Sequence, residues 1–295
     1  MSVVSRKYVN PDFCLEYLNA ARSHRNGDDF VQFPERFLKF NSKEQDVCII
    51  IPQDYSKVGA TLWDAAIVLV EYLSKILPQI DLSNKNICEL GAGCCIATIY
   101  LYLSHQNNNY NCLAIQELDD IIPHCKICIQ KNIKHINDDM DMTNTNIKFV
   151  GSPWNNDCVH LLRNELNIHN NTGYDLIVMS DVTYKEEDFS SLVDTIVGLV
   201  NDTTRIVIAY EQRRKDIKSV FEILLQRLSQ KGSVEEQCTE YIIEPPQQTE
   251  PPQVELLPPD LHVKEQDDSG NDNIHVKDGP TTVFRVHDYQ LSPFC

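Results

Sequence analysis

The sequence Asn86-Ile-Cys-Glu-Leu-Gly-Ala-Gly-Cys-Cys-Ile-Ala97 is the clearest indication of the fold. Its first residues, Asn86–Leu90, are typical of a short buried strand, and the apolar spacing after the glycines predicts a helix over Cys95–Ser104. Glycine lets the backbone turn sharply and approach a ligand without a Cβ in the way. The helix that follows offers unpaired N–H groups. In open α/β sheets, nucleotide-like ligands bind at this edge.

Strand-like and helical segments alternate on both sides of this stretch. We predict strands at Cys112–Glu117, Ile147–Gly151, Asp175–Asp181, Arg205–Glu211, Val234–Ile243 and Thr282–Tyr289. We predict helices at Thr61–Ile76, Asp120–His135, Glu186–Val200 and Arg214–Gln230. Short strands that alternate with helices are typical of an α/β fold with a mostly parallel sheet and helices on both faces.

The remaining segments are a lead-in and an insertion. Residues 1–58 form the lead-in, with a predicted helix at Pro11–His24 and predicted strands at Arg36–Phe40 and Val47–Ile51. Residues 244–279 contain three Pro-Pro pairs and nine acidic residues against two lysines. Such a segment cannot bury enough apolar surface to offset its ordering entropy. We therefore predict one domain, formed by residues 59–243 and 280–295, with a disordered acidic, Pro-rich insertion at 244–279.

Composition limits the classes of partner. The net charge of −17 argues against a nucleic-acid partner, because that binding draws on neutralised phosphates. An acidic surface favours encounter with a basic protein. No apolar stretch is long enough to span a bilayer, and the N-terminus lacks the pattern of a secretory signal. Several of the 11 cysteines lie in apolar runs, as reduced buried thiols do, so we expect a cytoplasmic protein that can also be nuclear.

Two features describe the expected ligand. The dinucleotide fingerprint needs a third glycine, which Cys94-Cys95-Ile96-Ala97 does not supply, so a pyrophosphate lacks its usual cradle. Glu117 ends the next strand, where a carboxylate can accept both hydroxyls of a ribose. As a single residue, it is equally suited to favouring the dipole of the next helix. Together the two features indicate an adenosine-type ligand without a diphosphate, and S-adenosylmethionine is the obvious candidate.

The sequence predicts no metal site. Cys125-Lys-Ile-Cys128 is one CxxC pair on a predicted helix, and no second pair accompanies it to complete a zinc site.

Five motifs follow one another in a fixed order: Gly59–Leu69, Glu89–Gly93, Ser152–Asn155, Ser180–Tyr184 and Tyr210–Arg213. In this order they resemble the protein-lysine methyltransferases of the methyltransferase-like 21 type, over roughly residues 35–230 and more weakly over 282–290. The resemblance implies a class I (Rossmann-like) sheet of seven strands, the last antiparallel. It also implies S-adenosylmethionine as cofactor and a lysine-bearing protein substrate, such as a chaperone, an AAA ATPase or a translation factor.

By position, the resemblance implies a cofactor-binding role for Trp63, Glu89, Gly91, Ala92, Gly93, Glu117, Trp154 and Ser180. Trp154 would lie beside the adenine. Glu117 stands where the family usually has aspartate, and Ser180 where alanine is common. Relatives often have Thr-Gly where this chain has Cys94-Cys95.

Three residues are candidates for the catalytic end of the site. Asp181, Tyr184 and Glu211 are expected to position the accepting amine or to pass its proton to water. Asp181 and Tyr184 have an ordinary structural interpretation as well, since they follow a predicted strand directly and an Asp there often caps the next helix.

Two other functions keep the fold and the cofactor. The acceptor could be an arginine or a histidine of a protein, because the motifs describe only cofactor binding. Alternatively, the chain could be a catalytically inactive cofactor-binding interaction module whose insertion contacts a partner. A dinucleotide oxidoreductase is disfavoured by the missing third glycine.

Overall fold

A computed structural model of the chain describes residues 4–8, 35–41, 46–104, 110–136, 146–165, 173–213, 218–243 and 282–293. The predicted helix at Pro11–His24 and the predicted insertion at 244–279 lie outside the described residues. The strands are β1 (Val4–Tyr8), β2 (Glu35–Asn41), β3 (Asp46–Pro52), β4 (Asn86–Leu90), β5 (Cys112–Glu117), β6 (Ile147–Gly151), β7 (Tyr174–Ser180), β8 (Val200–Glu211), β9 (Ser233–Ile243) and β10 (Thr282–Ser292). The α-helices are α2 (Asp64–Ile76), α3 (Ile96–Ser104), α4 (Ile122–Ile136), α5 (Asn156–Glu165), α6 (Phe189–Leu199) and α7 (Lys218–Leu228).

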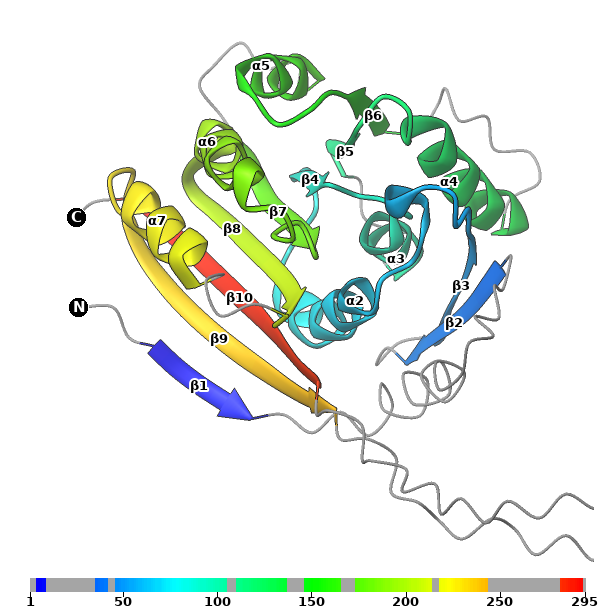
Figure 1. The fold of residues 1–295 in the computed structure, drawn as a ribbon, viewed down its shortest axis with the longest axis horizontal. Coiled ribbons are helices and arrows are strands. Elements are labelled where there is room, and N and C mark those ends of the chain that lie inside the picture. Colours follow the sequence, from blue (N-terminus) through cyan, green and yellow to red (C-terminus); the bar gives the residue numbers. More distant parts are fainter. Residues whose placement is uncertain are drawn as a thin grey trace, which may run out of the picture.

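Eight strands form one sheet in the order β1-β9-β10-β8-β7-β4-β5-β6 (Figure 1). From β6 to β8 all neighbours are parallel, whereas β10 runs antiparallel to both β8 and β9. This arrangement confirms the predicted mostly parallel sheet with an antiparallel last strand. The strand β1 pairs in parallel with β9 and adds an eighth strand to the predicted seven.

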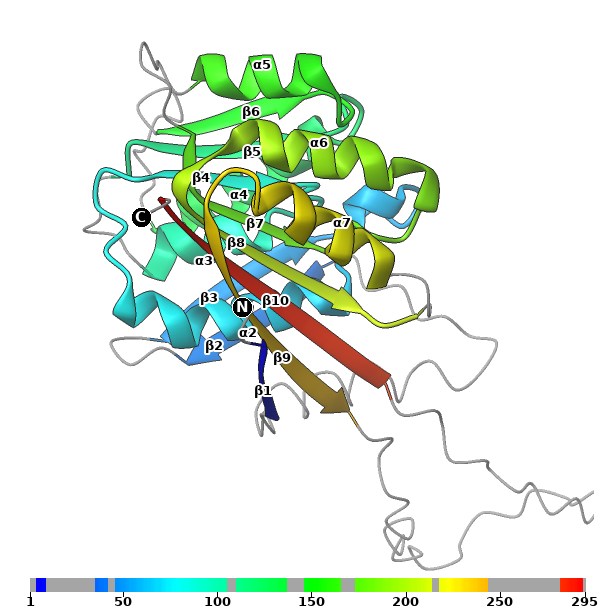
Figure 2. The same cartoon turned by 90° about the vertical axis from the view of Figure 1, so that its left-hand side faces the viewer.

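Helices cover both faces of the sheet (Figures 1 and 2). The face under α2, α3 and α4 has one buried core, and the face under α5, α6 and α7 has another. Successive residues of β4 supply the two cores in turn, with Ile87 in the first and Cys88 in the second. Burial on both faces explains why the central strands have nearly continuous apolar sequences.

The lead-in strands β2 and β3 form a separate two-stranded antiparallel sheet. Leu38 and Ile49 are buried in the same core as α2, α3 and α4. On α4, the side chain of Asn132 accepts from the backbone N–H of Ile50 at 2.8 Å and donates to the Ile50 carbonyl at 2.8 Å. Helix α4 therefore connects the β2–β3 hairpin to the larger sheet.

The structure contains a helix that the sequence did not predict. Helix α5 follows β6 and buries only Cys158 and Leu162, which are four residues apart. This apolar stripe is too narrow to indicate a helix against a polar background. Where a single helix was predicted over Glu186–Val200, a 3-10 turn, η4 (Glu186–Asp188), leads into α6 instead. Among the described residues, no helix combines the length and apolarity needed to cross a bilayer.

Candidate functional site

The loop between β4 and α3 has the backbone conformation that its glycines allow. Gly91 has a φ of +61° and Gly93 a φ of +52°, in the left-handed region that favours glycine. A Cβ on Gly91 would lie 2.7 Å from the side chain of Val182, and one on Gly93 would lie 3.0 Å from the carbonyl oxygen of Gly59. Neighbouring chain therefore approaches the loop closely on two sides.

Two side chains at the end of β5 hold this loop in place. The backbone N–H of Gly91 donates to the side-chain oxygen of Gln116 at 3.0 Å, and that of Gly93 donates to a carboxylate oxygen of Glu117 at 2.9 Å. The indole N–H of Trp154 donates to the same oxygen of Gln116 at 2.9 Å. Burial raises the pKa of the Glu117 carboxyl, although two backbone donors lower it.

A cavity of about 490 Å³ opens at the carboxyl ends of β4, β5 and β7. It lies where the strand order reverses between β4 and β7, which is the usual place for a ligand in such sheets. Most of the residues proposed from the sequence line it, namely Trp63, Gly91, Ala92, Gly93, Glu117, Trp154, Ser180, Asp181 and Tyr184. The fold thus brings together residues from segments far apart in the chain.

Two of the proposed site residues lie behind the cavity wall and do not line it. The buried carboxylate of Glu89 accepts from the backbone N–H groups of Ala97 at 3.3 Å and Thr98 at 2.9 Å, so it stabilises the start of α3. Burial raises its pKa to about 7. The Glu211 carboxylate accepts from the guanidinium of Arg213 at 2.8 and 3.0 Å, and its backbone N–H donates to Asp181 at 3.4 Å, so it contacts two residues that line the cavity.

Arg213 is a cavity residue to which the sequence assigned no role. Its guanidinium donates to Asp181 at 2.7 Å and lies 5.4 Å from the centre of the Trp63 ring. Asp181 has a φ of +53°, a strained conformation for a residue with a side chain. Burial raises the pKa of the Asp181 carboxyl, and the charge of Arg213 opposes that shift. The sequence offered one indication of this role, since Arg213 is a cation two residues after the end of a predicted strand.

The entrance of the cavity is formed by a loop that the sequence did not mark as functional. This loop supplies Lys57 and Val58, which line the cavity. The ammonium of Lys57 donates to the carbonyl of Asp120 at 2.7 Å. The Val58 carbonyl accepts from the indole N–H of Trp63 at 3.1 Å. Tyr184, with 48% of its surface exposed, forms another part of the rim.

The fold and the cavity define a class of protein. It is an α/β protein with a cavity at the switch point of its sheet, lined by the carboxylate that ends β5 and by a loop without the third glycine of the dinucleotide fingerprint. The chain belongs to the lysine methyltransferase family, which it matches over residues 42–227.

Several known proteins are similar to this chain. The UPF0665 family protein C23C4.06c of Schizosaccharomyces pombe is 24% identical over 232 residues, which are 76% of this chain and 64% of that protein. The protein N-lysine methyltransferase METTL21A of Danio rerio is 27% identical over 183 residues, or 61% of this chain and 74% of that protein. The crystal structure of SMU.776 complexed with SAH superposes with a TM-score of 0.48 at 11% identity, over 88% of this chain and 57% of that chain. The chain thus spans less than two thirds of the length of the first and the third of these proteins.

Proposed function

We propose that this protein is an S-adenosylmethionine-dependent N-methyltransferase that acts on a lysine side chain of another protein. The observation that carries the proposal is the position of Glu117, whose carboxylate faces the Gly91–Gly93 loop in a single cavity. Glu117 ends β5, the strand that follows the glycine loop and α3. A carboxylate at that position can accept the two hydroxyls of a ribose. Membership of the lysine methyltransferase family, and the lysine activity in the name of METTL21A, support lysine as the acceptor.

The cavity suits an adenosyl group with a cationic tail. Its volume of about 490 Å³ is within the range of small-molecule sites. Glu117 would hold the ribose, the Trp154 ring would flank the base, and the loop backbone at Gly91 and Gly93 would lie under the ligand. Bound S-adenosylmethionine would supply a methyl group that its sulfonium already activates, so this chain has to orient the acceptor and exclude water.

The acceptor end of the cavity has the groups that an amine requires. A free lysine has a pKa of about 10.4, so the amine must lose a proton before it attacks. Contact with the rings of Trp63 and Tyr184 would desolvate the ammonium and lower its pKa. The Asp181 carboxylate lines the same cavity beside Arg213, where it can hydrogen-bond the amine and pass its proton to water.

Charge around the entrance supports a basic protein substrate. The segment Glu186–Asp188 directly follows Tyr184 and Lys185 of the cavity, and none of its three acidic residues is buried. With a net charge of −17, the chain would attract lysine-rich segments. Nine cysteines in the described part are all free thiols, which supports a location in a reducing compartment such as the cytoplasm or the nucleus.

The test is incubation of the chain with methyl-labelled cofactor and a cell extract, followed by identification of the labelled residue. The parent should label a protein on lysine, and Asp181→Ala should label it far more weakly. Label on arginine or histidine alone would overturn lysine as the acceptor. A parent that binds the cofactor but labels nothing in any extract would instead favour the inactive interaction module.

A further inference from the structure

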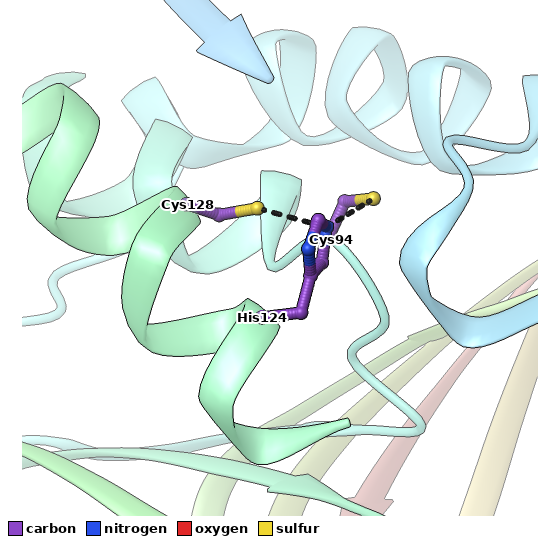
Figure 3. Close-up of side chains that lie close together, drawn as sticks. All are labelled: Cys94, His124 and Cys128. Carbon is purple, nitrogen blue, oxygen red and sulfur yellow. Dashed lines mark hydrogen bonds between the residues drawn. The ribbon is translucent and has the colours of Figure 1, made fainter. Parts of the chain in front are cut away.

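Cys94, His124 and Cys128 form a group of potential metal ligands (Figure 3). Of the three, Cys94 also lines the cavity. Cys94 directly follows the glycine loop, and His124 and Cys128 lie one turn apart on α4. The Nε2 atom of His124 is 3.8 Å from Sγ of Cys94 and 3.4 Å from Sγ of Cys128. All three ligand atoms lie within 4.8 Å of one another.

We propose that Cys94, His124 and Cys128 bind a thiophilic divalent cation, with Zn²⁺ as the natural occupant. Tetrahedral zinc with Zn–S bonds of about 2.3 Å and Zn–N bonds of about 2.0 Å separates a sulfur from a nitrogen ligand by about 3.5 Å. The two measured separations, 3.8 and 3.4 Å, lie on either side of that value. Two sulfurs and one imidazole leave the fourth position for a water molecule.

Hydrogen bonding satisfies this group only through long contacts. Two thiols converge on one ring nitrogen, which can donate or accept only one hydrogen bond at a time, and the other acceptor of the Cys128 thiol is the Pro52 carbonyl, 3.9 Å away. Cys125, on the same helix, shows the alternative, because its buried thiol donates to the Gly93 carbonyl at 3.2 Å. A metal ion would bind both sulfurs and the nitrogen together.

The surroundings of the group allow an ion to enter and to stay. The two cysteines are buried, at 4% and 0% exposure, whereas His124 is half-buried and gives access from solvent.

An ion at this position would act on the cofactor cavity. Cys94 lines that cavity and joins the glycine loop to α3, so its coordination would tie the loop to α4. The ion would thereby hold Gly93 where it faces Glu117. Metal and cofactor should then strengthen each other's binding, because coupling between two sites is reciprocal.

The sequence did not indicate this site because its ligands do not form a recognisable spacing. Cys128 belongs to the CxxC pair that the sequence singled out, but the pair's other member, Cys125, bonds elsewhere. The actual partners are a histidine one helical turn away and a cysteine from another segment, which only the folded chain brings together.

The test is metal binding by the tag-free full chain, purified under reducing conditions without chelator and loaded with Zn²⁺ or Co²⁺. We expect about one ion per chain after gel filtration. The Co²⁺ form should show sulfur-to-metal charge transfer and the visible bands of tetrahedral cobalt. Cys128→Ser and His124→Gln should each lower the affinity more than about tenfold, since even residues that only support metal ligands cost that much. Cys125→Ser is the matched control and should bind as the parent does.

Three results would overturn the proposal. One is a parent that retains only sub-stoichiometric metal without the cobalt spectrum. Another is a His124→Gln variant that binds the metal as tightly as the parent does. His124 is half-buried, so this variant still tests the site if Cys128→Ser fails to fold. The third is a Cys94–Cys128 disulfide in the purified chain that persists under reducing conditions and excludes the metal.

Discussion

The indole N–H of Trp154 donates to the side-chain oxygen of Gln116 at 2.9 Å. The same oxygen accepts from the backbone N–H of Gly91 at 3.0 Å, and the amide nitrogen donates to the Ser152 carbonyl at 2.6 Å. Gln116 is only 2% exposed. One buried amide therefore joins the glycine loop after β4 to the segment after β6, and both segments line the cavity.

The first prediction concerns this amide. Gln116→Leu keeps the approximate side-chain volume but leaves the N–H groups of Gly91 and Trp154 without an acceptor. Each buried polar group without a partner lowers the folding stability by about 1–3 kcal/mol. We expect a lower melting temperature and a loss of cofactor affinity of about tenfold or more, measured by thermal unfolding and calorimetry. Gln290→Leu, which removes an amide that bonds to Thr203 on another strand, should keep the parent's cofactor affinity. Equal affinities for parent and Gln116→Leu would refute the role of this amide.

The second prediction is a pH dependence of stability caused by Glu89. Its pKa is raised by burial from an ordinary 4.5 to about 7, so the folded state holds a proton that the unfolded state has lost. The stabilisation is complete below the ordinary pKa and is lost as the pH rises through about 7. We compare the unfolding free energy of the parent with that of Glu89→Gln. Between pH 4.5 and about 7, the difference should fall as the pH rises, by up to about 1.4 kcal/mol per pH unit.

Denaturant unfolding at a series of pH values measures this difference. Glu235→Gln, at an exposed position, serves as the control for the removal of a carboxylate. A difference between parent and Glu89→Gln that stays constant from acid to neutral pH would contradict the raised pKa.

The third prediction separates catalysis from cofactor binding at the acceptor end. Asp181→Ala should lower kcat by about 100-fold or more, as the loss of a proton-transfer group does. Tyr184→Phe should lower kcat as well, and both variants should bind the cofactor nearly as tightly as the parent. Asp194→Ala breaks an exposed ion pair with Arg227 and should leave kcat unchanged. Normal turnover in both Asp181→Ala and Tyr184→Phe would remove these residues from the mechanism.

The fourth prediction concerns the acidic residues beside the entrance. Replacing Glu186 and Glu187 by Gln keeps their size and removes two charges next to Tyr184. KM for a basic protein substrate should rise and its dependence on salt should weaken, with little change in kcat, because the charges act on encounter. Steady-state kinetics at two ionic strengths test this expectation. A fall in kcat with unchanged KM would show that these residues act on the chemical step instead.

The sequence predicted the centre of the fold accurately because burial there leaves a strong pattern. The structure gives the strands Asn86–Leu90, Cys112–Glu117 and Ile147–Gly151 the predicted bounds. Each is a short run whose end is marked by a change of pattern. Helix α5 escaped prediction because so little of it is buried, and β1 because it is a short strand at the edge of the sheet.

The parts of the site that the sequence did not reveal depend on tertiary contacts. Trp63 and Trp154 belong to recognisable motifs and Glu117 ends a predicted strand, whereas the approach of Lys57 to the cavity results from the path of a loop. Arg213 stood in a motif, but its contacts with Asp181 and Trp63 join three segments. No local sequence pattern predicts such contacts, because the two residues of each contacting pair lie in different segments and neither segment has an unusual sequence.

The most direct test of the account is calorimetric titration of the purified chain with S-adenosylmethionine and with its demethylated product, S-adenosylhomocysteine. The account predicts saturable binding of both by the parent and a loss of affinity of more than about tenfold in Glu117→Ala, which removes the carboxylate that would hold the ribose. No heat with either ligand, or unchanged binding by Glu117→Ala, would contradict the assignment of this cavity.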